Sequence, residues 1–198
     1  MKYFDTLPKI VQTDSNGISK VMTNLMARVS IIPQILNNPS LYYQYDIQEG
    51  DTPEIIAHKY YGDSYRYWIV LFANEILDPQ WNWPVSGSVF NEYLLKKYPN
   101  TNLNNFHNFE KIITTTDHGT NTTTTQKVVI GDDEYNSMIP GTKTFTLPTG
   151  DVTVTIDRNI VSIYDYEYAL NESKRNIKIL NSTYVNELET EFSKLMAS

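Results

Sequence analysis

The sequence predicts an α+β fold, with a helical core that opens on one strand, a small antiparallel β insertion and C-terminal helices. Residues 41–48 alternate apolar and polar side chains, as a half-buried strand does. Residues 52–98 contain three segments with the apolar spacing of helices. Residues 114–125 contain eight threonines, and threonine favours strands over helices.

Composition sets the scale and excludes several classes of function. The 198 residues suffice for one ordinary domain, or for a small domain with attachments. Sixteen basic and 23 acidic side chains give a net charge of −7, which repels nucleic acid. No apolar run reaches the length of about 18 residues that a membrane-spanning helix needs. Zero cysteines exclude disulfides and thiolate sites and suit a reducing cytoplasm.

Changes in composition along the chain divide it into four segments. We expect an extended N-terminal arm over residues 1–40, a core over 41–99, a threonine-rich antiparallel insertion over 100–160 and a C-terminal helical segment over 161–198. The first residues combine a charge with a proline where a signal peptide needs an apolar run, so secretion is not expected.

The N-terminal arm carries only scattered apolar side chains. A turn composition occupies residues 14–17, and prolines at 33 and 39 prevent a long regular element. Residues 19–30 are compatible with either a short helix or a short strand. Such an arm cannot bury itself alone.

The first core helix has clear signals at both ends. Thr52 can cap it, and Pro53 occupies the first turn, where a missing N–H costs nothing. Gly62 ends it, because glycine enters the left-handed conformation at little cost. A second helix, capped by Asp63 or Ser64, places its apolar residues at helical spacing and ends at Asp78-Pro79.

A third helix follows the tryptophan pair at 81 and 83. Ser86 or Ser88 can cap it, and Pro99 ends it. The core is thus a strand followed by three helices.

Two hairpins are predicted in the insertion. The first joins residues 112–113 to 128–130 through a polar, solvent-exposed turn at 117–119. The second joins residues 143–147 to 152–156 through a Pro-Thr-Gly-Asp turn. We expect a helix from about 163 to 175.

Residues 177–180 either continue that helix or form a short strand. Ser182 or Thr183 then caps a last helix. Its apolar stripe packs on this chain or on a neighbour, and comprises Val185, Leu188, Phe192 and Leu195.

No catalytic, metal or cofactor residue is predicted. The glycine, serine and histidine templates of common enzymes are absent from the sequence. No two of the three histidines have the spacing of a helical metal site. The acidic run 132–134 is interpreted as a solvated turn. A carboxylate hydrolase would need two acids, but Glu49, Asp51, Glu54 and Asp63 each have a local explanation as a strand end, cap or helix-dipole partner.

Aromatic side chains are in excess, with 15 tyrosines, seven phenylalanines and three tryptophans. Such an excess is typical of protein interfaces and of glycan or peptide grooves. Trp81 and Trp83 point to opposite sides of an extended segment. Either one ring lies in the core and the other on the third helix, or one of the rings has a role at an interface.

Two parts of the sequence resemble known protein families. Residues 45–57, Tyr-Asp-Ile-Gln-Glu-Gly-Asp-Thr-Pro-Glu-Ile-Ile-Ala, followed by Lys-Tyr-Tyr-Gly-Asp at 59–63, look like the opening of a LysM module. The continuation at 67–74, Tyr-Trp-Ile-Val-Leu-Phe-Ala-Asn, with Asp78-Pro79 and Trp83-Pro84, resembles the baseplate wedge proteins of T4-type contractile phage tails, the gene-product-fifty-three family. Further matching residues lie at 7–10, 41–43 and 171–180; the threonine-rich middle is outside the resemblance.

The LysM resemblance implies a LysM-like β-α-α core, here with an extra helix, and the wedge resemblance implies a non-enzymatic structural protein. It implies a place in the virion tail baseplate, assembly in the host cytoplasm, and contacts that join neighbouring wedge subunits around a sixfold ring. The residues expected at partner interfaces are Tyr3, Phe4, Leu7, Ile10, Trp81, Trp83, Val185, Leu188 and Phe192.

The LysM resemblance implies an alternative function, peptidoglycan binding beside a cell-wall-active tail protein. In LysM modules the glycan lies at the strand–helix junctions, which correspond here to Gly50, Asp51, Thr52 and Asp78. The sequence after Asn74 leaves room for only a very short second strand, so we expect the structural function rather than glycan binding.

Overall fold

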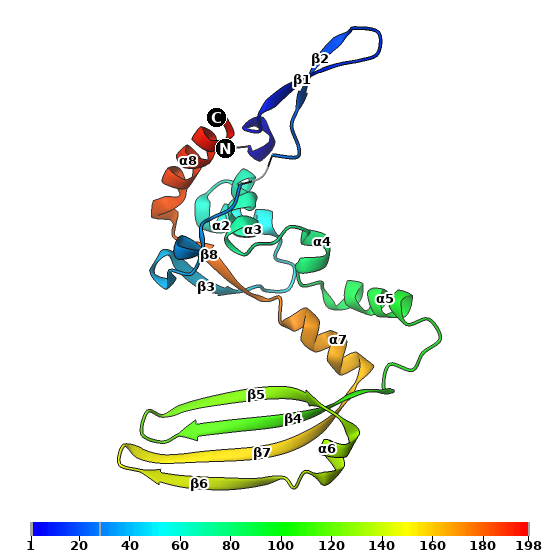
Figure 1. Cartoon of the computed structure of the whole chain (residues 1–198), viewed down its shortest axis with the longest axis vertical. Coiled ribbons are helices and arrows are strands. Elements are labelled where there is room, and N and C mark those ends of the chain that lie inside the picture. The colour runs from blue at the N-terminus through cyan, green and yellow to red at the C-terminus, as the bar shows by residue number, and fades with distance from the viewer. Residues whose placement is uncertain (1, 28, 198) are drawn as a thin grey trace. The chain divides into compact units, whose positions relative to one another are not determined.

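The computed structural model describes residues 2–27 and 29–197. The chain forms two compact units, which are described separately. The first comprises residues 1–86 and 171–198, and the second comprises residues 87–170. Figure 1 shows their elements.

The first unit contains the β1–β2 hairpin, two further short strands, several helices and single turns of 3-10 helix (η). Its elements are η1 (Tyr3–Asp5), β1 (Lys9–Thr13), β2 (Ser19–Thr23), α1 (Pro33–Leu36), η2 (Pro39–Leu41), β3 (Tyr42–Asp46), α2 (Pro53–Tyr61), η3 (Ser64–Arg66), α3 (Tyr67–Ala73), α4 (Pro79–Asn82), β8 (Asn176–Leu180), η4 (Ser182–Tyr184) and α8 (Val185–Ala197).

Both predicted ends of α2 are confirmed. The Thr52 hydroxyl accepts a hydrogen bond from the amide of Ile55, and Pro53 occupies the first turn. Gly62 ends the helix with φ of 70°. Asp63 caps η3, as predicted, through a hydrogen bond from the amide of Tyr65.

The strand predicted over 41–48 is β3, and it pairs antiparallel with β8. Its partner therefore comes from residues 176–180, more than a hundred positions along the chain, and not from the segment that follows α3. Of the two interpretations of 177–180, the strand is the one observed.

The hydrophobic core of the first unit lies between β3–β8 and helices α2, α3 and α8. Ile56, Ile69 and Ile179 are completely buried. Trp68 from α3 packs its ring against Phe192 from α8, with centroids 4.8 Å apart. Leu7 from the N-terminal arm also belongs to this core.

The arm contains a β-hairpin, β1–β2, between Pro8 and Asn24. The segment for which helix and strand were left open is thus a strand from Ser19 to Thr23. In Figure 1 the hairpin extends away from the rest of its unit.

The second unit is a four-stranded antiparallel sheet with helices at one end. Its elements are α5 (Gly87–Lys97), β4 (Phe106–Asp117), β5 (Thr122–Ile130), α6 (Asp132–Ser137), β6 (Gly141–Leu147), β7 (Gly150–Ser162) and α7 (Ile163–Glu172), whose last two residues belong to the first unit. The strand order is β5-β4-β7-β6, so both predicted hairpins are confirmed.

Three local predictions are corrected. The second core helix ends at Ala73, and Asp78-Pro79 starts the extra turn α4 instead of ending that helix. The acidic run 132–134, predicted as a turn, begins α6, because carboxylates suit the positive end of a helix. The last helical segment is capped by Asn181, whose side chain accepts from the amide of Thr183.

Candidate assembly surfaces

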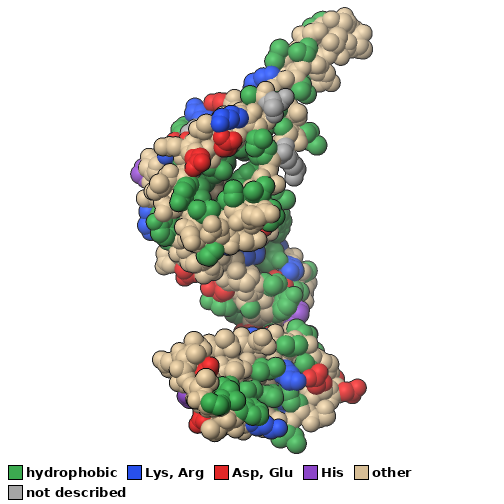
Figure 2. Space-filling view, turned by 60° about the vertical axis from the view of Figure 1, so that its left-hand side comes forward, with side chains coloured by type: hydrophobic (Ala, Val, Ile, Leu, Met, Phe, Trp, Pro, Cys, Tyr) green, Lys and Arg blue, Asp and Glu red, His purple; other side chains and the backbone are tan. Residues whose placement is uncertain are grey.

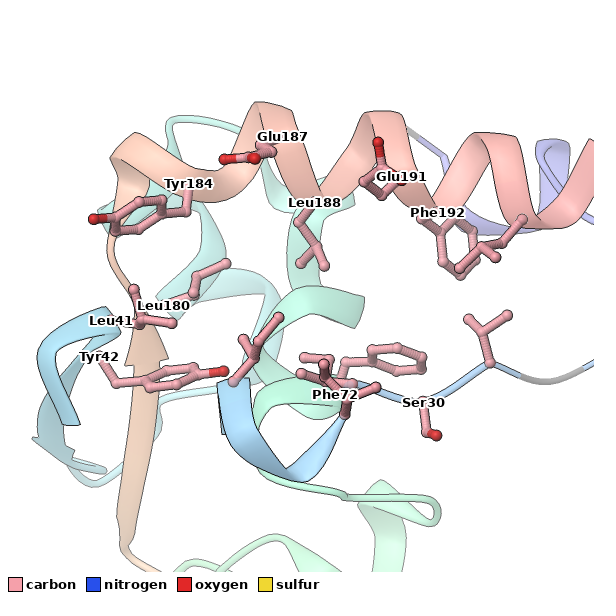
Figure 3. A pocket seen from close by; sticks show the side chains of 15 residues that line it. Ser30, Leu41, Tyr42, Phe72, Leu180, Tyr184, Glu187, Leu188, Glu191 and Phe192 are labelled. Atoms are coloured by element: carbon pink, nitrogen blue, oxygen red, sulfur yellow. The ribbon is translucent and has the colours of Figure 1, made fainter. Parts of the chain in front are cut away.

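An apolar groove of about 470 Å³ lies between α8 and the segment around α1. Figure 3 shows Leu188 and Phe192 pointing down from α8 into the groove, with Phe72 on the opposite side. Tyr42 from β3 closes part of the floor, and burial raises the pKa of its hydroxyl. The groove is therefore built by three parts of the first unit that are distant in sequence.

The rim of this groove is acidic. Glu187 and Glu191 are the charged residues among its described lining. Glu191 also contacts Lys194 in an ion pair on the helix surface, where both side chains are exposed. Such a surface pair contributes little to stability and exchanges readily. Leu195, exposed to 58%, extends the apolar lining to the end of the groove.

The β1–β2 hairpin is exposed on both faces. Val11 and Val21 are opposite each other on one face and are exposed to 68% and 71%. Ile10 and Met22 are paired on the other face and are also exposed. An isolated two-stranded hairpin is marginally stable in water, so these side chains are suited to contact with another surface.

The sheet of the second unit has one face made largely of threonine. The register places four threonines side by side across the sheet, and a second row of four lies two residues away. The rows are Thr125, Thr114, Thr155 and Thr142, and Thr123, Thr116, Thr153 and Thr144. Neighbours in these rows hydrogen-bond, such as Thr142 and Thr155 at 3.0 Å.

The opposite face of the sheet carries large apolar side chains, with Lys111, Lys143 and Arg158 among them. Side chains alternate between faces along a strand, so Phe145 and Leu147 lie opposite the threonines of β6. Both are about half exposed, at 52% and 48%. Figure 2 shows hydrophobic side chains gathered on the visible face of this unit. The sheet therefore has a face suited to water and a face suited to a partner.

Helix α6 covers one end of the apolar face. The ring of Tyr135 stacks on Phe109 with centroids 4.2 Å apart, and Arg158 lies over the Tyr135 ring. Lys111 and Glu134 form an ion pair at 3.1 Å beside them. The helix leaves the part of the face near Phe145 exposed.

The residues expected at partner interfaces are split between core and surface. Leu7, Trp83, Val185 and Phe192 are buried in the core of the first unit, because that core lacks enough apolar side chains from α2 and α3 alone. Tyr3 and Leu188 are partly buried against the same core. Phe4, Ile10 and Trp81 are exposed, at 57%, 43% and 62%.

The tryptophan pair behaves as the sequence predicted, with one ring buried and one exposed. Trp83 is 8% exposed, and its Nε1 donates a hydrogen bond to the carbonyl of Asp51 at 2.9 Å. Trp81 lies on α4 and is largely exposed. The short helix, and not an extended segment, separates the two rings.

Three of the four glycan-site candidates gather at one junction. Gly50, Asp51 and Thr52 line a small pocket of about 190 Å³ together with Trp83. The Asp51 carboxylate accepts hydrogen bonds from the Tyr45 hydroxyl at 2.6 Å and from the amide of Gln48 at 3.0 Å. Asp78 is not among the residues lining this pocket and caps α4 instead. The polar groups of the junction are thus used within the chain.

The other acidic candidates have structural partners. Glu49 lies 3.6 Å from Arg175, and Glu54 occupies the first turn of α2. Within residues 2–27 and 29–197, no group of three or more His, Cys, Asp or Glu side chains is arranged to hold a metal ion. None of the helices described has both the length and the apolar character to cross a bilayer.

Sequence reasoning missed the groove and the two-faced sheet. The groove depends on α1 and α8 meeting, and no local pattern connects residues 29–36 with 184–195. The two faces of the sheet could have been predicted in part, because Thr142, Thr144 and Thr146 alternate with Lys143, Phe145 and Leu147. What was missing was the register that aligns this alternation across four strands.

The chain was compared with known families and proteins. No curated protein matches it. The family model described as Base plate wedge protein 53 matches residues 3–195, including the threonine-rich segment that the sequence resemblance left out. A match over nearly the whole chain confirms the family predicted from the sequence motifs. The chain therefore belongs to the base plate wedge protein 53 family, whose members are structural proteins of the phage tail baseplate.

Proposed function

We propose that the chain joins neighbouring wedges around the inner baseplate of a contractile phage tail, in a sixfold ring, through protein–protein contacts. Membership of a base plate wedge family implies assembly with other baseplate subunits. The proposal adds that the contacts run between wedges, that the chain acts without catalysis, and that it assembles in the host cytoplasm.

The observation that carries this proposal is the exposed hairpin. Every residue of β1 is exposed, and so are four of the five residues of β2. The apolar side chains on both faces contribute nothing to the core of this chain. Contact with neighbouring subunits would bury these side chains, which the fold of the chain itself leaves exposed.

Two further surfaces support an assembly role. The groove beside α8 and the apolar face of the sheet each leave large hydrophobic side chains exposed, including Leu195 and Phe145. Large contiguous patches of exposed apolar surface are typical of interaction sites. Phe4 and Trp81 are exposed candidates from the sequence that belong to this proposal.

Removal of the hairpin tests the proposal. The amide of Asn24 donates to the carbonyl of Pro8 at 2.8 Å, so two glycines can replace residues 9–23 without moving the ends. Deletion of residues 1–35 would be less clean, because it also removes Leu7 from the core. We expect the shortened chain to fold and to fail to associate with the other wedge proteins in a reconstitution.

The matched control keeps the hairpin and changes only its tip, as Ser15→Ala. This variant should assemble normally, because Ser15 lies outside both strands. If the hairpin deletion folds and still assembles wedges normally, the hairpin is not needed to join them and the proposal loses its main support. Imaging of the assembled product would then show whether the chain lies between wedges.

The alternative function is peptidoglycan binding through a LysM-like core. The observation that favours it is topological: β3, α2, α3 and β8 occur in this order along the chain, with the second unit inserted between α3 and β8, and the two strands pair antiparallel. This is the order of a LysM module with a long insertion before its second strand. We propose that the core has this ancestry and that its junction is used for packing.

Retention on insoluble peptidoglycan separates the two functions. Specific retention that Asp51→Asn and Thr52→Ser weaken would support glycan recognition, since both changes keep the shape of the junction. We expect no specific retention, because the Asp51 and Thr52 side chains already accept hydrogen bonds within the chain. A muropeptide hydrolysis assay on the same preparation tests the third possibility, a carboxylate hydrolase.

A further inference from the structure

We propose that the partner of the α8 groove is the β1–β2 hairpin of a second copy of this chain. The inference rests on the proposed function and specifies one of its contacts. Both surfaces are apolar, both are exposed, and both belong to the first unit. A contact between two different patches of the same protein is heterologous, so repetition of it produces a ring or a chain of copies.

Shape and exposure favour the face of the hairpin that carries the valines. Val11 and Val21 are the most exposed apolar side chains of the two strands. They project together from one face, because they are cross-strand partners. A pair of branched side chains suits a groove lined by Leu188, Leu195 and Phe72.

The charges of the two surfaces favour the hairpin as the occupant of the groove. Lys9 lies two residues from Val11 and therefore on the same face of the hairpin. The described lining of the groove contains two glutamates, Glu187 and Glu191, and no basic residue. In the proposed contact the ammonium group of Lys9, which donates to the Thr23 hydroxyl of its own hairpin, faces Glu187 on the rim of the groove, beside the Glu191–Lys194 ion pair.

The hairpin of the same copy does not fill this groove. The strand residues of the hairpin are exposed and are absent from the groove lining. Its root is held by Leu7 in the core and by the bond between Asn24 and Pro8. A neighbouring copy can supply the hairpin without changing that root.

The contact is small, since it involves one face of two five-residue strands. Contacts below the size of standard interfaces are weak in isolation. Several copies held in one assembly raise the effective concentration of each hairpin near the next groove. The test therefore traps the contact covalently instead of relying on a stable dimer.

Disulfide trapping is suited to this chain because it has no cysteines. One copy carries Val11→Cys and a differently tagged copy carries Leu195→Cys; both positions are exposed, so the changes should leave the fold intact. Oxidation of the mixture should give the mixed dimer. Matched controls are Gln12→Cys, on the opposite face of the hairpin, and Thr190→Cys, on α8 outside the groove lining.

We expect the Val11→Cys and Leu195→Cys pair to form at a rate about tenfold above either control pair, which corresponds to about 1.4 kcal/mol of activation free energy. Equal rates for test and control pairs would overturn the inference. So would an intrachain disulfide in a chain that carries both cysteines, because the hairpin would then close on its own groove.

Charge exchange gives a second readout. Lys9→Glu in the hairpin copy, or Glu187→Lys in the groove copy, should each slow trapping, and the two changes together should restore it. Lys20→Glu, on the other face, is the matched control and should leave the rate unchanged. Absence of rescue would count against the pairing.

The two proposals fail separately. If trapping shows no preference while the hairpin deletion still blocks wedge assembly, the hairpin binds a different subunit, so the copy-to-copy contact is wrong and the assembly function stands. If the hairpin deletion assembles normally, the hairpin has no role in wedge assembly and the proposed function is wrong on this point, whatever the trapping result.

Discussion

The side chain of Asn74 pairs with the backbone of Lys178 as one residue of a third strand would. Its Oδ1 accepts from the amide of Lys178, and its Nδ2 donates to the carbonyl of Lys178, both at 2.7 Å. The same Nδ2, on the residue that directly follows α3, donates to the carbonyl of Val70 within that helix. One amide therefore connects the end of α3 to the outer edge of β8 and satisfies backbone groups at that edge.

Replacement of Asn74 by alanine should destabilise the first unit by about 1–3 kcal/mol, because the amide and carbonyl of Lys178 would lose their partners. Chemical denaturation measures this change. Lys178→Gln is the matched control, since it keeps the backbone pairing and removes only the hydrogen bond from the Lys178 ammonium group to the Leu36 carbonyl. Equal losses for the two variants would show that the backbone bonds are not the cause.

The two tryptophans give a second test, of core against surface. Trp83→Ala removes a buried ring and its bond to the Asp51 carbonyl, and should cost about 3–5 kcal/mol. Trp81→Ala changes an exposed ring and should stay within about 0.5 kcal/mol of the parent. Thermal unfolding followed by circular dichroism compares them. A comparable loss for Trp81→Ala would mean that its ring supports the fold.

Local signals in the sequence predicted local structure well. Thr52 and Gly62 fix the ends of α2 through contacts within four residues, so the sequence alone identifies them. The alternation in 41–48 identified β3 for the same reason. One buried and one exposed tryptophan were also expected, but the premise of an extended segment was wrong, because Trp81 lies in α4.

Long-range pairing was not predictable from these signals. β3 finds its partner in β8, and the link through Asn74 spans 104 positions, which no local periodicity encodes. The same limit explains Leu7, Val185 and Phe192, which were assigned to interfaces. Each occurs in a segment too poor in apolar residues to fold alone, and each is buried because distant segments complete the core.

The two faces of the inserted sheet give a third prediction. Phe145→Ser with Leu147→Ser should change stability by no more than about 0.5 kcal/mol, because both side chains are half exposed. The pair should reduce binding of a dye that reports exposed apolar surface. Thr144→Ser with Thr146→Ser, on the other face of β6, should leave dye binding unchanged. Equal dye binding by both variants would argue against an apolar docking face.

The last prediction concerns acid sensitivity of the second unit. Glu167 is 3% exposed and accepts hydrogen bonds from Lys97 at 2.8 Å and from the Tyr98 hydroxyl at 2.7 Å. Burial opposes ionisation, but these bonds outweigh it, and the pKa of Glu167 is lowered from its ordinary 4.5. The lowered pKa means that the folded state holds the ionised carboxylate more favourably than the unfolded chain does.

This stabilisation is fully present above pH 4.5, the ordinary glutamate pKa, and is lost as the pH falls through the lower pKa of the folded state. Glu167→Gln removes the charge, so at pH 7 it should cost about 1–3 kcal/mol, and the difference from the parent should shrink below pH 4.5. Urea unfolding from pH 7 down to acid measures both chains. Glu92→Gln is the control: its ion pair with Lys96 is exposed on both sides, so its difference from the parent should be much smaller than that of Glu167→Gln at every pH. A gap between Glu167→Gln and the parent that persists in acid would show that shape, and not ionisation, is what Glu167 contributes.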